Sequence, residues 1–256
     1  CPIHTKGTKC LHCKPCGIVC GWGGAGAYSD GKLTLTTEFG GMLDQYMEKP
    51  ALLKLIDYVD DIYLKFGATH EVYGDDNKEA VRKLQKDSAA ADMSLIPARI
   101  RHLGTDKCLE ILTLMRDHLE DKCTIRTSDS VMRIIVEDGR YVGVETNRGE
   151  IFHSKYLIAA PGREGSEWFA GQAAQLGLEM ITNPVDIGVR VEVPAVVMEQ
   201  ITDVVYESKL VYYTKSFDDR VRTFCMNPYG VVVAENNAGL MTVNGHKKKK
   251  KTTENT

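Results

Sequence analysis

Four cysteines near the start of the chain are spaced closely enough to hold a metal ion or an iron–sulfur cluster. They are Cys10, Cys13, Cys16 and Cys20. The C-x2-C-x2-C-x3-C spacing is ferredoxin-like, because closely set thiolates on a turning backbone can converge on one cluster. No proline follows Cys20, and in the bacterial pattern the fourth cysteine serves another cluster. A single 4Fe-4S cluster would therefore need Cys1 or a remote residue as a ligand.

Two other interpretations of this cysteine run stay open. The run could bind zinc, with His4 and His12 as nitrogen ligands, or it could consist of reduced thiols packed around a loop. Four of the eight cysteines fall in the run, and such crowding suits a metal or cluster in a reducing compartment better than a disulfide network. We therefore expect a cytoplasmic protein.

A glycine-rich segment follows the cysteine run directly. Residues 21–26 (GWGGAG) match G-x-G-x-x-G, which normally places a pyrophosphate on a helix N-terminus just after a strand. Here no apolar strand precedes the match and no amphipathic helix follows it, so the match taken alone is weak and a tight structural turn explains it better. Over residues 21–33, however, the glycines let a flat ligand or a phosphate approach bare backbone amides, and Ser29, Asp30 and Lys32 add polar groups.

Apolar periodicity predicts the helices that must position these segments. Apolar residues recur at three- and four-residue spacing over residues 50–66, beginning at a proline suited to a first turn. Residues 75–91 indicate a shorter, polar helix, and residues 94–103 an extended segment. Thr105 and Asp106 then open a helix to about residue 121, where capping and the helix dipole favour them.

Beyond this helix the pattern becomes typical of strands. Residues 125–137, 141–147 and 150–160 predict a β-meander joined at Asp138-Gly139 and Arg148-Gly149. The third strand should be buried and should end sharply at Pro161-Gly162. A helix is predicted over residues 166–176. From residue 183 a β-rich region follows, with strands predicted at 185–193, 209–214, 220–226 and 230–235.

Charge and composition argue against some classes of partner. The net charge is −3 and the pI about 6.2, so the chain lacks the positive excess that attracts nucleic acid or an anionic membrane. No stretch approaches the roughly 20 apolar residues of a membrane span. The five lysines at 247–251 suit a solvated loop, and a nucleic-acid contact there is the minority interpretation. We expect no nucleic-acid partner and no membrane partner.

Three strings of the sequence together resemble a bacterial family of FAD-dependent dehydrogenases, mostly of unassigned substrate. The family is part of the glutathione-reductase-like superfamily of NAD(P)/FAD-dependent oxidoreductases. The strings are GWGGAGAYSDGKL at 21–33, IFHSKYLIAAPGREGSEWF at 151–169 and VRTFCMNPYGVVV at 221–233. In such proteins the phosphate-binding strand, turn and helix lie upstream. We therefore expect this chain to be an internal piece that lacks its first βαβ unit, and we expect the piece alone to be inactive.

The resemblance also implies which residues contact the cofactor. In the glycine loop these are Gly23, Gly24, Ala25, Gly26, Ser29 and Gly31, with Asp30 and Lys32 as polar groups of the same loop. Residues 159–162 (AAPG) are similar to the superfamily's second FAD motif, usually Ala-Thr-Gly. Pro161 replaces the threonine and removes a hydroxyl and a backbone donor, so a contact there must use the Gly162 N–H or Arg163. Arg163 is explained almost as well as a solvated loop residue.

Several further candidates have ordinary explanations. The resemblance suggests that the turn at His102 faces the cofactor domain, although such a histidine is more often packed or solvated. The resemblance also implies a substrate pocket on strands of the last region, which carry Arg190, Arg222, Cys225 and Asn227. Paired charges on strands are usually one solvated face, so we assign no catalytic residue.

Together these observations predict an α/β fold with a split, Rossmann-like FAD-binding domain. Residues 1–44 would form its Cys/Gly-rich flavin-proximal region, 45–100 a helical insertion, 101–182 its helix, meander and Ala-Pro-Gly turn, and 183–256 a truncated β-rich substrate domain. The predicted function is FAD-dependent dehydrogenation of a small-molecule substrate, with a 4Fe-4S cluster, NAD(P) and an electron-transfer partner as further candidates. The alternatives are a non-catalytic iron–sulfur or zinc module for electron transfer, and a flavoprotein that modifies nucleic acid.

Overall fold

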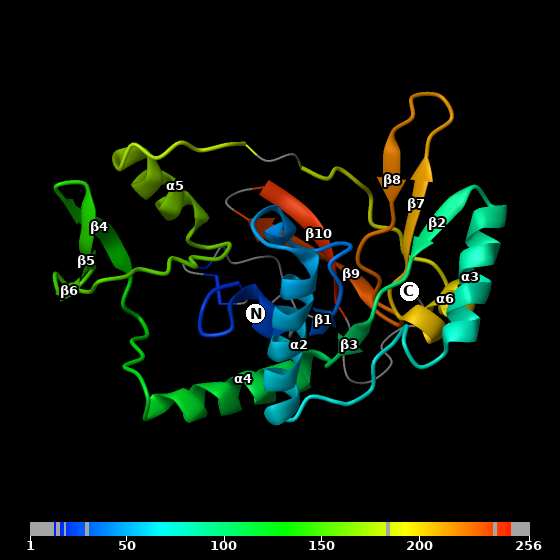
Figure 1. Cartoon of the computed structure of the whole chain (residues 1–256), viewed down its shortest axis with the longest axis horizontal. Helices are drawn as coiled ribbons and strands as arrows, with labels where there is room; N and C mark the ends of the chain where they lie inside the picture. The colour runs from blue at the N-terminus through cyan, green and yellow to red at the C-terminus, as the bar shows by residue number, and fades with distance from the viewer. Residues whose placement is uncertain are drawn as a thin grey trace. The chain divides into compact units, whose positions relative to one another are not determined.

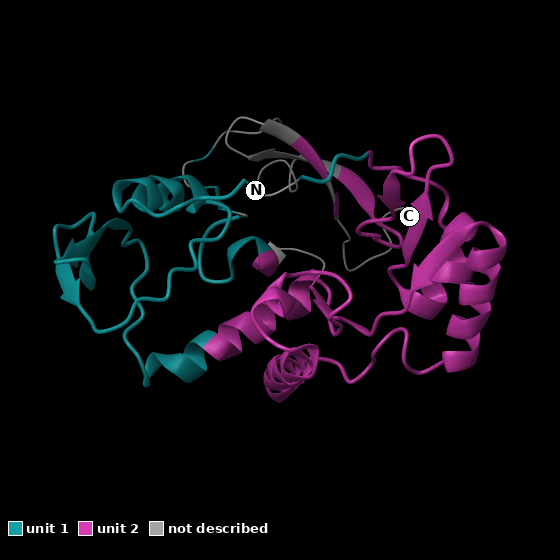
Figure 2. Ribbon diagram, turned by 45° about the horizontal axis from the view of Figure 1, so that its top comes forward, with its two compact units in different colours: residues 1–25, 116–188 teal, residues 26–115, 189–256 magenta. Residues whose placement is uncertain are grey.

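A computed structural model describes residues 13, 16, 17, 19–28, 31–182, 185–237 and 240–246 of the chain. The chain divides into two compact units (Figure 2): unit 1 is residues 1–25 and 116–188, and unit 2 is residues 26–115 and 189–256. Both helices and strands form, which confirms the mixed α/β class. Every strand pairing among the described residues is antiparallel, so the parallel sheet of a Rossmann-like domain is not found there.

The helices of unit 2 confirm most of the periodicity argument. They are α2 (Lys49–Lys65), α3 (Lys78–Ala90), α4 (Thr105–Glu120) and α6 (Ala195–Val205), and α4 continues into unit 1. Pro50 lies in the first turn of α2, and the side chain of Asn77 caps α3. α4 buries Cys108 and Ile111. None of the helices that the structure describes has the length and apolar character to cross a membrane.

Small antiparallel sheets make up the rest of unit 2. Their strands are β1 (Lys32–Thr34), β2 (Met93–Ile96), β3 (Ile100–His102), β7 (Lys209–Tyr213), β8 (Arg220–Arg222), β9 (Val231–Asn237) and β10 (Leu240–His246). β1 pairs with β3, which sets Lys32 opposite His102. A second sheet has the order β2-β7-β8, with α3 packed beside β2, and β9 and β10 form a hairpin (Figure 1). The segment before residue 100 and the segment after residue 200 therefore share one sheet.

Two buried features fix β3 in unit 2. Arg101 pairs with Asp60 of α2, and both side chains are almost completely buried. On the preceding residue, Ile100 exchanges two backbone hydrogen bonds with Tyr73. β3 is therefore held from α2 and from the 73–74 segment, in addition to its pairing with β1.

Unit 1 contains the predicted β-meander and one helix that covers it. Its elements are β4 (Val131–Glu137), β5 (Arg140–Thr146), β6 (Ile151–His153) and α5 (Ser166–Gln175). Asp138 and Gly139 both have positive φ, as a two-residue hairpin turn requires, and Gly149 has φ 74° at the second turn. On α5, Gln172 accepts from the Ile134 N–H at 2.8 Å and the Trp168 indole donates to Met132 O at 3.0 Å. These contacts attach α5 to β4. The positive φ values at the turns and the bounds of α5 confirm the predicted hairpins and helix.

Four sequence predictions about strands are wrong. The first meander strand begins at Val131 instead of residue 125. The third meander strand ends at His153 instead of residue 160, and the following segment, predicted to be buried, leaves Ile158 92 % exposed. Residues 185–193 form no strand, and β8 ends at Arg222 rather than residue 226. A strand needs a neighbour for its N–H and C=O groups, and among the described residues no strand pairs with 154–160 or 185–193.

The helix α6 and the strands β1 and β10 were not predicted. α6 follows Pro194, and its apolar residues recur at helical spacing, but its several valines favour a strand when they are taken alone. The division of the sequence into four segments stays a prediction.

Candidate functional site

A run of four consecutive polar residues lies buried in unit 2. Tyr206, Glu207, Ser208 and Lys209 expose 3, 7, 0 and 4 % of their surfaces. Charged residues are almost never fully buried unless they are paired, because an unpaired charge is costly to remove from water. Within the described part of the chain, this run is therefore the strongest candidate for a functional site.

The end of α6 and the start of β7 position this buried run. Tyr206 follows the last residue of α6 with φ 54° and ψ −57°, and its N–H donates to Thr202 O at 2.9 Å. A positive φ is an outlier for an aromatic residue and is maintained only where the surroundings impose it. Lys209 then begins β7, which pairs with β2. The two residues between are thus fixed from both sides.

Glu207 binds two lysine ammonium groups at once. Its Oε2 lies 2.5 Å from Lys32 Nζ, and its Oε1 accepts a hydrogen bond from Lys209 Nζ. Lys32 Nζ also donates to Met226 O at 3.2 Å. Burial would raise the pKa of Glu207, but the two ammonium groups outweigh it, and the pKa of this carboxyl is lowered. Among the residues that the structure describes, the cluster thus contains one carboxylate and two ammonium groups.

Two aromatic rings enclose the second ammonium group. Lys209 Nζ lies 5.1 Å from the ring centroid of Phe39 and 5.0 Å from that of Phe224. At such distances the negative faces of the rings attract a cation. The Lys209 side chain therefore ends between the Glu207 carboxylate and two aromatic rings.

His102 adds an acid–base group to the same place. It lies on β3 opposite Lys32, and its Nε2 is 2.9 Å from the Tyr206 hydroxyl. The two rings also stack, with centroids 4.3 Å apart, and the ring of Tyr73 lies 5.2 Å from that of Tyr206. Through the pairing of β3 with β1, and through the chain at Tyr206, this imidazole–phenol pair lies beside residues of the Glu207 cluster, and such groups can bind a polar ligand and move protons.

The predicted glycine loop is divided between the units. Gly23 lies in a turn, and η1 (Gly24–Tyr28) begins at the next residue. Gly23, Gly24 and Ala25 belong to unit 1, whereas Gly26, Gly31 and Lys32 belong to unit 2. Ser29 and Asp30 lie outside the described residues. Of the loop residues that the structure describes, Lys32 belongs to the buried cluster and Gly31 directly precedes it.

Two glycines of unit 2 differ in what surrounds them. At Gly26 an added Cβ would meet no atom of the described residues within 4 Å. The Gly26 carbonyl accepts from the Cys108 thiol at 3.4 Å, and burial raises the pKa of that thiol. At Gly31, with φ +67°, an added Cβ would lie 3.1 Å from Leu103 Cβ and 3.3 Å from Cys108 Cβ. Packing accounts for Gly31, whereas Gly26 leaves room for a ligand.

Pro161, Gly162 and Arg163 form a turn before α5 in unit 1. Pro161 O accepts from the Gly165 N–H at 3.3 Å, and Gly162 has φ 62°. Arg163 is exposed, and its carbonyl accepts from the Ser166 hydroxyl at 2.9 Å. The turn therefore starts a helix, and the role predicted for it in FAD binding stays a prediction.

The cysteine run is described only in part. Cys13 is exposed, and the Cys20 N–H donates to Cys16 O at 3.0 Å, which sets Cys16 and Cys20 one helical turn apart. Cys10 lies outside the described residues, as do Cys1, His4 and His12. Among the residues that the structure describes, no group of three or more side chains is arranged to hold a metal ion.

The residues that were predicted to lie on strands of a substrate pocket are near the buried run in sequence, but their contacts are with neighbouring residues of the fold. Arg190 donates to Cys225 O, and Arg222 lies over the Phe224 ring with its guanidinium carbon 5.3 Å from the centroid. Asn227 is buried against Gly245, where an added Cβ would come within 2.0 Å of its amide nitrogen. These contacts explain the residues without a catalytic role.

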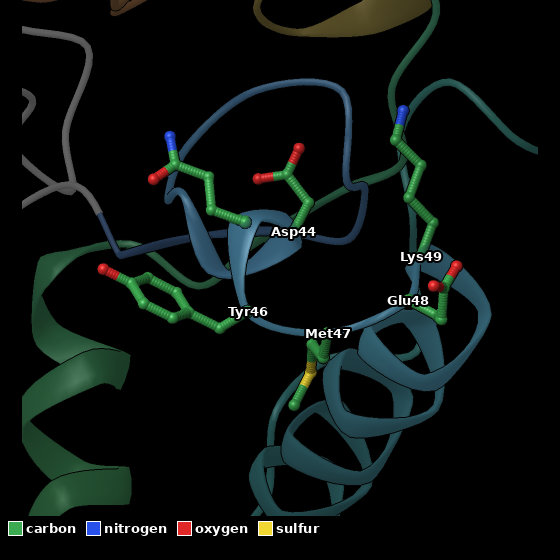
Figure 3. A pocket seen from close by; sticks show the side chains of 6 residues that line it. Asp44, Tyr46, Met47, Glu48 and Lys49 are labelled. Carbon is green, nitrogen blue, oxygen red and sulfur yellow. The ribbon is translucent and has the colours of Figure 1, made fainter.

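A surface hollow of about 450 Å³ lies where η2 (Leu43–Gln45) meets α2. Its lining is one continuous segment, residues 44–49. Figure 3 shows that the labelled side chains, among them Asp44, Tyr46 and Lys49, spread apart instead of converging on one point. The hollow therefore lacks the convergent polar groups of a binding site.

Comparison of the chain with protein-family models gave no match, and a search of curated proteins gave none.

Proposed function

We propose that this chain is part of an FAD-dependent dehydrogenase with a Rossmann-like FAD domain. The proposal is supported by the resemblance of the strings at 21–33, 151–169 and 221–233. The observation that favours it most is at Gly26, inside the first string, where a Cβ would meet none of the described atoms within 4 Å and a ligand could approach the backbone. The crowded thiols near the start favour a cytoplasmic location. A small molecule would be the substrate, with NAD(P) or an electron-transfer protein as the second reactant.

Bound FAD would supply the redox chemistry, and the protein would bind, orient and shield the reactants. In this proposal the backbone at Gly23, Gly24, Ala25 and Gly26 approaches the cofactor. Gly31 has a different task, because its packing sets the course of the chain into β1. Lys32, His102 and Tyr206 would then lie on the substrate side, where they offer a charge and a proton-transfer pair.

Gly26→Val should abolish flavin retention by protein expressed from its complete coding sequence. The φ of Gly26 is ordinary and no neighbour crowds the added side chain, so the fold should tolerate valine while a ligand in that space should not. Flavin absorbance after gel filtration measures retention, and circular dichroism measures folding.

Gly41→Val is the matched control, because Gly41 is also uncrowded and has an ordinary φ but lies outside the proposed cofactor loop. It should keep its flavin. Full retention of flavin by Gly26→Val, or loss of folding together with flavin, would contradict the proposed approach of the ligand.

An iron–sulfur site is the second candidate, and it rests on the turn that sets Cys16 and Cys20 near one another. We expect anaerobically purified protein, stripped of flavin, to contain iron and acid-labile sulfide together. Cys13→Ser should remove both, because a cluster needs a closed set of thiolate ligands. Cys123→Ser, at another exposed cysteine of unit 1, should remove neither.

Metal analysis also separates the alternatives for the cysteine run. Zinc would be found as one metal ion per chain without sulfide, and His4 or His12 would then matter as much as a cysteine. If neither iron nor zinc is present, the electron-transfer part of the proposal is lost and the flavin part is unaffected.

A further inference from the structure

The buried cluster around Glu207 carries more positive than negative charge. Lys32 and Lys209 both contact the one carboxylate of Glu207, and the exposed fractions of the three side chains are 14, 5 and 7 %. With all three groups ionised the cluster has a net charge of +1. Removal of an uncompensated charge from water is unfavourable, and a bound anion would offset it. We propose that this cluster binds the carboxylate or phosphate group of an anionic small molecule, with Lys32 as the direct contact.

The two lysines differ in their capacity to contact a ligand. Lys209 donates to Glu207 and is enclosed by two aromatic faces, which stabilise its remaining charge. Lys32 has two described acceptors, Glu207 and the Met226 carbonyl. An ammonium group can donate three hydrogen bonds, so the third of Lys32 is available to an anion. Lys32 is also the more exposed of the two, which makes it the group that a ligand reaches first.

The position of Lys32 identifies the source of the anion. Lys32 directly follows the glycine loop, yet its ammonium group is turned to Glu207 and Met226, both in the region expected to bind substrate. The geometry therefore assigns the anion to the substrate instead of to a phosphate of the cofactor. The assignment to a substrate rests on the proposed function, whereas anion binding by Lys32 does not.

The test uses two simple probes, inorganic phosphate and succinate, titrated at constant ionic strength into the complete protein. Calorimetry measures binding, and the melting temperature should rise with saturation because the folded state alone binds the anion. Lys32→Met should weaken binding roughly ten- to a hundredfold, the contribution of a charge-assisted hydrogen bond. Lys83→Met, which removes an equal charge at an exposed site on α3, should bind both probes like the wild type.

Glu207→Gln should change binding in the opposite direction. It removes the only carboxylate among the described residues of the cluster, so a folded variant should bind phosphate more tightly than the wild type and depend on it for stability. If both cluster variants fail to fold, the wild-type titration still decides, because no saturable binding of either probe overturns the proposal. Equal affinities of Lys32→Met and the wild type overturn it as well.

Two further arms identify the source of the anion. Addition of FAD should leave phosphate and succinate binding unchanged, and competition by FAD would overturn the assignment to a substrate.

Asp30→Asn tests whether the carboxylate of Asp30, within the chain itself, occupies the anion site. If the wild type binds neither probe and this variant binds both, the chain supplies its own carboxylate and the proposal fails. Absorbance of retained flavin is read separately, so the proposed function and the anion site can fail independently.

Discussion

Arg101→Met should lower the free energy of unfolding by about 3–5 kcal/mol. The Arg101 guanidinium donates to both oxygens of Asp60, at 2.6 and 2.7 Å, and to the carbonyl of Thr69. Both charged side chains are less than a tenth exposed. Methionine fills a similar volume but leaves the Asp60 carboxylate buried without a counter-charge. Urea unfolding followed by circular dichroism measures the loss.

Arg99→Met is the matched control for this prediction. Arg99 lies two residues earlier, has a 42 % exposed side chain, and approaches Asp57 and Asp75 only to 3.6 and 3.7 Å. The same substitution there should cost no more than about 1 kcal/mol. The double variant Asp60→Leu/Arg101→Met removes both charges and should recover part of the lost stability. If Arg101→Met and Arg99→Met lower the free energy of unfolding equally, the buried pair of Arg101 and Asp60 does not support β3.

The sequence predicted the elements whose pattern is local. Helices α2, α3, α4 and α5 lie within a few residues of the predicted ranges because each has an apolar spacing that its own residues complete. The turns of the meander were predictable for the same reason, since Asp138-Gly139 and Gly149 supply the positive φ that the hairpins need.

Pairing between distant segments could not be predicted in this way. β2 pairs with β7 with Met93 opposite Tyr212, and no local pattern states which strand a given strand will join. The same limit explains the errors at 154–160 and 185–193, where a strand-like pattern has no described partner. In α6 the β-branched residues hid a helical spacing, because β-propensity depends strongly on context.

The candidate site illustrates the same limit. Lys32 was predicted to bind the cofactor because of its place in the glycine loop, but its partner Glu207 lies 175 residues later. Tyr206, Glu207 and Lys209 were missed, since the polar residues 206–208 ahead of a predicted strand indicate a solvated loop when seen alone. One weak signal of the site was present in the sequence. Lys209 begins an apolar strand, and a lysine that such a strand buries needs a partner of opposite charge.

Gly74→Ala should destabilise the protein by about 3–4 kcal/mol. Gly74 has φ +83°, and a Cβ there would lie 2.1 Å from Ala98 O, a backbone atom that cannot rotate aside. Next to it, Tyr73 and Ile100 exchange hydrogen bonds of 2.8 and 3.0 Å. Relief of the clash would break both, at about 1 kcal/mol each, in addition to roughly 1–2 kcal/mol for left-handed backbone in a residue with a Cβ.

Gly104→Ala separates the clash from the backbone strain. Gly104 has a similar φ of +78°, but an added Cβ there meets no atom within 4 Å. It should therefore lose only the roughly 1–2 kcal/mol of the left-handed conformation, as measured by the same urea unfolding. If the two variants lose equal stability, the Ala98 carbonyl can move at little cost. The bridge between Tyr73 and Ile100 would then not be a rigid support of β3, and the position of His102 beside Tyr206 would depend on the Arg101 pair and on β1 alone.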